Sequence, residues 1–212
     1  MNDKFFEELK EKIQIYFEEG GSHSFDHTQR VYNLALKISK GENADLDIVK
    51  TASLLHDIAR LKQDNKEIEC HAEHGAEMVR EILEKTNFPK GKIEKVCYAI
   101  KSHRYSKGLK AETKEAEILQ DADRLDALGA ICIGRIFSYG GKKGRALYDS
   151  KIKPDVKYKS DAKTSLNHFY EKNLKIKPET FKTKKARKIA KGIYKFIEEF
   201  VKRFKLEWEG KE

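Results

Sequence analysis

The stretch "SLLHDIARL", residues 53–61, combines the pattern of a packing helix with two polar residues in its middle. Its apolar residues, Leu54, Leu55, Ile58 and Leu61, recur at helical spacing. His56 and Asp57 stand side by side, and neighbouring residues on a helix point about 100° apart, so they make a poor pair within it. We therefore expect a group outside this helix to draw both side chains inward.

Helical periodicity extends from this stretch over most of the chain. Prolines occur only at positions 89, 154 and 178, and no segment shows the alternation of a strand between turn signals. The spacing predicts helices over residues 5–17, from 24 or 26 to 41, from 45 or 47 to 61, and over 71–85, 91–103 and 114–138, with a last helix striped from Ile189 to Phe204. The sequence therefore predicts an all-α fold.

The domain organisation that we expect is a single domain over residues 1–212. Its core spans about 22–138, a loop rich in Gly, Lys and Ser covers 139–163, and helices over 164–208 pack on the core. The last helix is basic and amphipathic, a pattern that can also lie on a membrane or a partner. Closing the domain's own core is the simpler expectation.

The charge of the chain bears on its partners. Lys and Arg total 44 against 35 Asp and Glu, a net charge of +9, which favours phosphates, nucleic acid or acidic surfaces over cations. Much of this charge lies on the outer faces of the predicted helices, so we expect a solvated surface rather than a nucleic-acid interface.

The cysteines and the apolar runs bear on the compartment. Cys70, Cys97 and Cys132 lie far apart and form no CxxC motif, which fits a reducing environment. The first residues lack the features of a signal peptide, and no apolar run approaches the ~18 residues of a membrane-spanning helix. We expect a soluble, cytoplasmic protein that binds no membrane.

One set of polar residues interrupts the apolar stripes of three predicted helices. It contains His27, the pair His56 and Asp57, and an aspartate in "ILQDADRLDALGA", residues 118–130. A lone helical histidine is usually hydrogen-bonded or exposed, but unpaired burial of several such groups would be costly. Imidazole nitrogen and carboxylate oxygen together suit a divalent transition metal such as Mn, Fe, Co, Ni or Zn. The combination predicts a metal centre between helices.

These residues carry a family resemblance. His27, His56–Asp57 and "ADRL" at 122–125 match, in order and spacing, the H…HD…D signature of the HD superfamily of metal-dependent phosphohydrolases. The segments "FDHTQRVYNLAL", "LLHDIA", "ILQDADRLDALGAICIGRIF", "YGGKKGRALYD" and "LNHFYEKNLKI" resemble its small stand-alone bacterial and archaeal members, so the similarity covers about residues 22–208. The HD pair alone is a weak signal, whereas five segments in order are specific. The resemblance implies an all-α bundle with one metal centre between helices.

The resemblance implies that the metal ligands are His27, His56, Asp57 and Asp123. Asp121 and Asp123 lie about 200° apart on a helix, so only one of them faces the metal. The "ADRL" pattern favours Asp123, whereas Asp121 shares the apolar face with residues such as Leu125. We take Asp123 as the ligand and Asp121 as its rival.

Two further histidines, His74 and His103, lie between the HD pair and the last aspartate. Similar proteins with histidines in this interval can hold a second metal. With His56 and Asp57 they form the candidate catalytic set, as ligands, acid groups or phosphate contacts. The alternative is that His74 and His103 are ordinary histidines on helix surfaces.

Phosphate recognition has candidates in "GGKKGR", residues 140–145, where flexible backbone N–H groups would lie beside Lys142, Lys143 and Arg145. The segment lacks the spacing of a Walker loop or of a dinucleotide fingerprint. Arg30 and Arg104 could add positive charge near the metal.

The resemblance implies hydrolysis of a nucleoside triphosphate, a small-molecule substrate, to its monophosphate and pyrophosphate by metal-activated water. Mn is the favoured metal, with Fe, Co, Ni, Zn or Mg as alternatives and a second ion left open. Rival activities are a nucleoside monophosphatase, a cyclic-nucleotide phosphodiesterase and, if two irons bind, oxygen chemistry. A rival of another class is a nucleotide sensor or nucleic-acid-binding module that retains the metal site. The sequence leaves open the base, the sugar, the number of phosphates and the oligomeric state.

Overall fold

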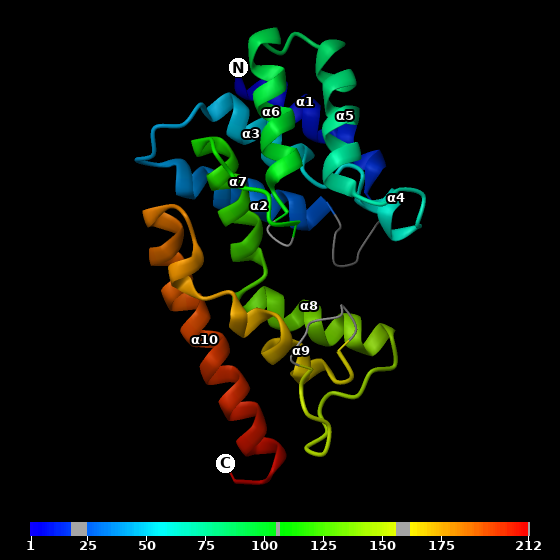
Figure 1. Cartoon of the computed structure of the whole chain (residues 1–212), viewed down its shortest axis with the longest axis vertical. Coiled ribbons are helices and arrows are strands. Elements are labelled where there is room, and N and C mark those ends of the chain that lie inside the picture. Colours follow the sequence, from blue (N-terminus) through cyan, green and yellow to red (C-terminus); the bar gives the residue numbers. More distant parts are fainter. Residues whose placement is uncertain (18–24, 105–106, 156–161, 212) are drawn as a thin grey trace. The chain divides into compact units, whose positions relative to one another are not determined.

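The computed structural model describes residues 1–17, 25–104, 107–155 and 162–211 (Figure 1). These residues form helices joined by turns and loops, and the described part of the chain contains no β-strand beyond an isolated bridge between Ala146 and Thr164. The all-α prediction is thus confirmed. The chain forms two compact units, Met1–Asp123 and Arg124–Glu212. Residue 22 as the start of the core, residue 24 as a helix start and residues 156–161 of the expected loop lie outside the described residues.

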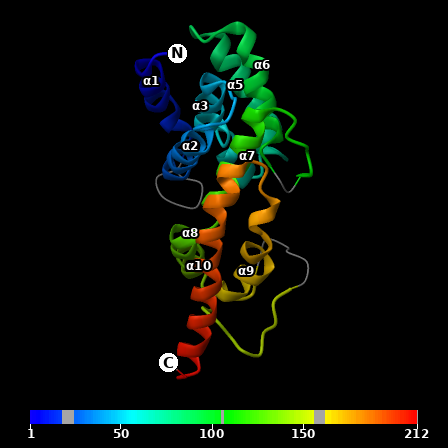
Figure 2. The same cartoon turned by 90° about the vertical axis from the view of Figure 1, so that its left-hand side faces the viewer.

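The first unit contains the helices that carry the predicted site. They are α1 (Asp3–Ile13), a short 3₁₀ turn η1 (Gln14–Tyr16), α2 (Phe25–Ser39), α3 (Leu46–Leu55), α4 (Arg60–Asp64), α5 (His71–Glu84), α6 (Lys90–Ser102) and α7 (Lys114–Asp126). In both Figure 1 and Figure 2, α5 and α6 lie side by side, and α3 packs on α2 and α6. Helix α3 is therefore the central element of this unit.

The sequence explains this central position. Asp45 begins α3, and its side chain accepts a hydrogen bond from the Asp47 N–H at 3.0 Å. From Ile48 to Leu55 every residue except Lys50 is buried, whereas Leu46 at the start of the helix is 50% exposed. A helix buried over most of its circumference is typical of one packed on more than one face.

Helix α3 ends at Leu55, earlier than the predicted end at residue 61. The Ile58 N–H donates to Leu55 O at 3.2 Å and the Arg60 N–H donates to Asp57 O at 2.8 Å, so a tight turn precedes α4. His56, the C-cap residue of α3, keeps helical backbone angles of φ −60° and ψ −33°. The HD pair therefore lies at the end of α3, immediately before this turn.

The second unit contains α8 (Gly129–Lys142), α9 (Ser165–Glu171), two short 3₁₀ turns, η3 (Asn173–Lys175) and η4 (Pro178–Thr180), and α10 (Lys184–Trp208). Helix α8 packs along α10, next to it in Figure 2. Between them the Phe137 ring stacks on Phe204 with centroids 5.6 Å apart and tilts against Phe169 at 6.0 Å. The apolar face of the basic last helix thus packs in the core of its own unit.

The prediction of one helix over 114–138 is wrong at its centre. The N–H groups of Ala127 and Leu128 bond three residues back, to Arg124 O and Leu125 O, and Gly129 adopts φ +79°, a conformation that favours glycine. The chain therefore leaves α7 and begins α8. Helix α8 continues to Lys142, so the loop expected from residue 139 begins four residues later.

Among the described residues, no helix combines the length and the apolar character that crossing a membrane requires.

Two adjacent glycines of α8 test the packing of the second unit. A Cβ at Gly140 would overlap the Ser165 hydroxyl at the start of α9, whereas a Cβ at Gly141 would meet nothing within 4 Å. We expect Gly140→Ala to lower the free energy of unfolding by about 1–3 kcal/mol, because the buried Ser165 side chain must turn away or α9 must shift. Gly141→Ala should leave it unchanged or raise it by up to about 1 kcal/mol, since alanine favours a helix. Urea unfolding measures both, and equal midpoints would contradict the packing described here.

Candidate metal centre

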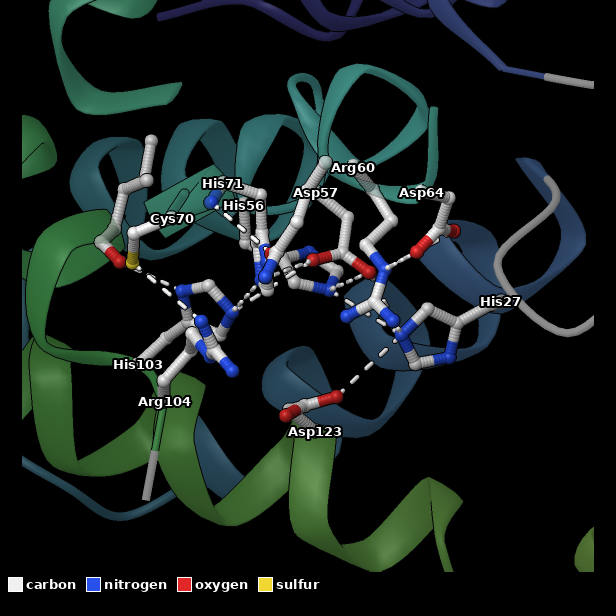
Figure 3. A network of polar contacts seen from close by, with 12 residues as sticks. His27, His56, Asp57, Arg60, Asp64, Cys70, His71, His103, Arg104 and Asp123 are labelled. Carbon is white, nitrogen blue, oxygen red and sulfur yellow. Dashed lines mark hydrogen bonds and ion pairs between the residues drawn. The ribbon is translucent and has the colours of Figure 1, made fainter. Parts of the chain in front are cut away.

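The first unit gathers six polar side chains from five of its helices and their ends (Figure 3). All are buried except Asp123, whose side chain is 30% exposed. They are His27 of α2, His56 and Asp57 after α3, His71 at the start of α5, His103 at the end of α6, and Asp123 of α7. The sequence predicted five of the six for this site, and His71 is the addition.

One half of the cluster surrounds the ring of His27. Its Nε2 lies 3.3 Å from His56 Nε2 and 3.4 Å from Asp123 Oδ1. The same nitrogen lies 3.7 Å from Asp57 Oδ2. Ligand atoms about 2.0–2.2 Å from a common ion lie at such separations from one another. The ligand atoms of His27, His56 and Asp57 all lie within 4.8 Å of one another, so this group could hold a metal ion.

The other half of the cluster uses the second oxygen of the same aspartate. Asp57 Oδ1 lies 3.1 Å from His71 Nε2 and 3.7 Å from His103 Nε2. The two histidine nitrogens are 3.3 Å apart. These three residues form a second group whose ligand atoms lie within 4.8 Å of one another. Asp57 therefore belongs to both groups and lies between them.

Three of the imidazoles are oriented by oxygens that can only accept a hydrogen bond. His56 Nδ1 donates to Ser53 O at 2.9 Å, and His103 Nδ1 donates to Ile100 O at 2.6 Å. His71 Nδ1 donates to the side-chain oxygen of Gln63. Because Nδ1 carries the proton in each neutral ring, Nε2 presents a lone pair to the centre of the cluster. Facing lone pairs repel each other unless a cation lies between them, so this donor set fits a divalent metal.

The pKa shifts of His103 and Asp123 agree with a metal site. Burial and the neighbouring His56 lower the pKa of His103 to about 4, although Asp57 and Asp123 oppose the shift. Burial alone would raise the pKa of Asp123, but the hydrogen bond from His27 and nearby histidine charges hold it below its usual range. At neutral pH His103 is thus neutral and Asp123 ionised, the states that metal ligands need. A neutral His103 is also a poor general acid.

The structure separates the remaining histidine candidate from the cluster. The side chain of His74 is 35% exposed, and its Nδ1 lies 3.9 Å from Glu77 on the surface of α5. His71, three residues earlier, is buried and faces Asp57. The sequence analysis missed His71, although "CHAEH" shows two histidines in the same helical turn. Only the packing of the first turn of α5 distinguishes them.

The two aspartates of α7 also differ. Asp123 Oδ1 lies beside His27, whereas Asp121 is wholly buried. The geometry favours Asp123 as the residue of α7 that faces the cluster.

Two arginines border the cluster in Figure 3. Arg104 follows His103 and donates from Nη1 to Cys70 Sγ at 3.5 Å. Arg60, which was not among the residues expected from the sequence, appears near the cluster in Figure 3, and its Nε contacts both carboxylate oxygens of Asp64 at 3.1 and 3.2 Å. Its position three residues after Asp57 could have indicated it. Arg30 lies on α2, three residues after His27 and therefore on a similar face of the helix.

The basic segment of the second unit differs from the prediction. The N–H groups of Lys143 and Arg145 donate to Gly140 O at 3.1 and 2.8 Å, and the Gly144 N–H donates to Gly141 O at 3.0 Å. These backbone donors complete the end of α8, so the expectation of free, flexible N–H groups is wrong. The side chains of Lys143 and Arg145 lie over the Tyr139 ring at 5.9 and 5.7 Å, and Lys142 ends the helix.

Comparison with known proteins adds an independent line of information. The HD domain family matches residues 24–128, which include all six residues of the cluster. The uncharacterized protein YpgQ of Bacillus subtilis is 30% identical over 96% of this chain and 94% of its own length.

Solved structures resemble the chain over nearly its whole length. An HD-superfamily hydrolase from Bacillus thuringiensis is 33% identical, with a TM-score of 0.74 over 97% of both chains. A predicted HD-superfamily hydrolase from an uncultured Thermotogales bacterium is 32% identical, with a TM-score of 0.69 over 98% of this chain and 99% of that one. YpgQ of Bacillus subtilis in complex with ADP is 28% identical, with a TM-score of 0.75 over 98% of this chain and 100% of that one.

The two aspartates of α7 give a test of the geometry. We expect Asp123→Asn to weaken Mn²⁺ binding roughly tenfold or more, because a carboxylate beside His27 is lost. Asp121→Asn should bind Mn²⁺ as the unaltered protein does. Calorimetric titration of the metal-stripped variants measures the affinity, and circular dichroism checks that both fold. Loss of binding only in the Asp121 variant would contradict this assignment.

Proposed function

The chain belongs to the HD-domain superfamily of metal-dependent phosphohydrolases, and we propose that it hydrolyses nucleoside triphosphates to nucleoside monophosphates and pyrophosphate. The buried cluster around Asp57 carries this proposal, because it offers imidazole nitrogens and carboxylate oxygens as ligands at one point. The relative YpgQ was crystallised with ADP, which supports a nucleotide as the substrate.

We assign the first metal ion to His27, His56, Asp57 and Asp123. Two of these four ligands are carboxylates, which suits Mn²⁺ among the divalent metals of this class. A bound ion there would lower the pKa of a water and polarise a phosphoryl oxygen. The protein itself orients the site: Ser53 O fixes the ring of His56, and His27, His56 and Asp57 are buried.

The same geometry supports a second ion at Asp57, His71 and His103. The observation that favours it is the pair of Nε2 atoms of His71 and His103, 3.3 Å apart, each with its proton on the opposite nitrogen. Asp57 would be a ligand in both groups. In this proposal His103 is a ligand rather than an acid group.

Basic side chains at the border of the cluster would hold the phosphates. Asp64 holds Arg60 through Nε, so the Nη groups of the guanidinium remain for a substrate. Such N–H groups match phosphate oxygens in pairs. Arg104 would bind at the side of His103, with Arg30 on α2 as a further contact. Lys142, Lys143 and Arg145 of the second unit stay candidates through their side chains.

The reaction is tested with metal-stripped protein that is supplied again with Mn²⁺ and mixed ribo- and deoxyribonucleoside triphosphates. Phosphorus NMR should show monophosphate and pyrophosphate in equal amounts. His56→Ala is the control and should react at least about 100-fold more slowly, because a metal ligand is lost. Diphosphate with orthophosphate, or unchanged triphosphates, would contradict the proposal. Turnover of monophosphates or cyclic nucleotides instead would favour the rival phosphohydrolases.

The number of ions is tested by titrating the metal-stripped protein with Mn²⁺ in a calorimeter. We expect two ions per chain at saturation, and one in His71→Ala, because that change removes a ligand of the second group only. One ion per chain in the unaltered protein would exclude the second site and leave the first intact.

A further inference from the structure

Three histidines of the cluster, His56, His71 and His103, obtain their Nδ1 acceptors in two different ways. His56 and His103 follow the last residues of α3 and α6, and each donates to a carbonyl three residues earlier, Ser53 O and Ile100 O. Carbonyls in the last turn of a helix lack partners within the helix, so they are available as acceptors. The helix end itself thus fixes these two rings.

His71 lies at the opposite kind of helix end. It is the first residue of α5, where the backbone offers free N–H donors and no free carbonyls. The preceding residue, Cys70, makes no side-chain capping bond. A ring in this position needs an acceptor from elsewhere to hold its proton on Nδ1.

Gln63, on the short helix α4, supplies that acceptor. Its Oε1 accepts from His71 Nδ1 and from the His71 backbone N–H, the latter at 3.2 Å. Its Nε2 donates to Glu69 O at 3.0 Å. Because Glu69 O can only accept, the orientation of the Gln63 amide is fixed, and the proton between Gln63 and His71 belongs to the histidine.

We propose that Gln63 is a positioning residue that holds His71 in the tautomer with a bare Nε2, and thereby completes the metal group of Asp57, His71 and His103. The proposal rests on the assignment of His71 as a metal ligand made above. A hydrogen-bond acceptor behind a histidine ligand fixes its ring and raises its basicity, and losing such an acceptor typically costs about 10–100-fold in metal affinity.

The test compares three variants of the full-length protein. Gln63→Met keeps the length of the side chain and removes both hydrogen-bonding atoms. Gln63→Glu keeps an acceptor for His71 but loses the donor to Glu69 O. Asn65→Leu is the matched control: it removes a hydrogen bond to Glu67 in the turn that follows α4 and touches no histidine.

Calorimetric titration with Mn²⁺ gives the affinity of each site. We expect Gln63→Met to weaken the second ion about 10–100-fold and to change the first less than about threefold. Gln63→Glu should restore the affinity of the second ion, because the bond to His71 returns. Asn65→Leu should change neither. If Gln63→Glu does not restore binding of the second ion, the loss of affinity would come from the missing hydrogen bond to Glu69 O. That result would overturn the proposal.

A second readout needs no metal. Nitrogen-15 NMR of the histidine rings in metal-free protein distinguishes the protonated ring nitrogen from the bare one, and His71→Gln identifies the His71 signals. We expect Nε2 of His71 to be bare in the unaltered protein and in Gln63→Glu, and partly protonated in Gln63→Met. An unchanged tautomer in Gln63→Met would overturn the proposal. If the unaltered protein binds one ion only, the second site fails, and this readout still decides the role of Gln63.

Discussion

The buried carboxylate of Asp57 is the constraint around which the first unit is arranged. An isolated charge inside a protein costs several kcal/mol, so each of its oxygens must meet a compensating group. One oxygen faces His27 and the other faces His71 and His103. Elements far apart in the sequence must therefore converge on one residue, and the packing of α3 between α2 and α6 brings them there.

Helix ends, rather than helix middles, supply most of this convergence. His56 and Asp57 follow Leu55 at the end of α3, and carbonyls in the last turns of α3 and α6 accept hydrogen bonds from the rings of His56 and His103. At the start of α5 the backbone offers N–H donors instead of carbonyl acceptors. The side-chain oxygen of Gln63 therefore accepts the hydrogen bond from His71. The orientation of these three imidazoles thus follows from which end of a helix carries them.

The sequence predicted those features that follow from the periodic spacing of buried residues. It predicted less well those that depend on tertiary contacts. Apolar spacing predicted the all-α fold, and polar residues within apolar stripes indicated His27, His56 and Asp57. Apolar spacing did not predict the breaks after Leu55 and before Gly129, because a tight turn of a few residues hardly disturbs that spacing. Periodicity could not choose between His71 and His74, since both lie in one turn of α5. The single-domain organisation and the roles of the site residues stay predictions.

The central claim is that Asp57 lies between two metal positions. Diffraction from crystals soaked in Mn²⁺, measured at the manganese absorption edge, locates such ions without reference to activity. The account predicts two anomalous peaks, one contacting His27, His56, Asp57 and Asp123 and the other contacting Asp57, His71 and His103. A single peak at the first position would refute the role of Asp57 as a ligand in both groups. The absence of any peak in the cluster, with manganese bound elsewhere on the chain, would contradict the whole account of the site.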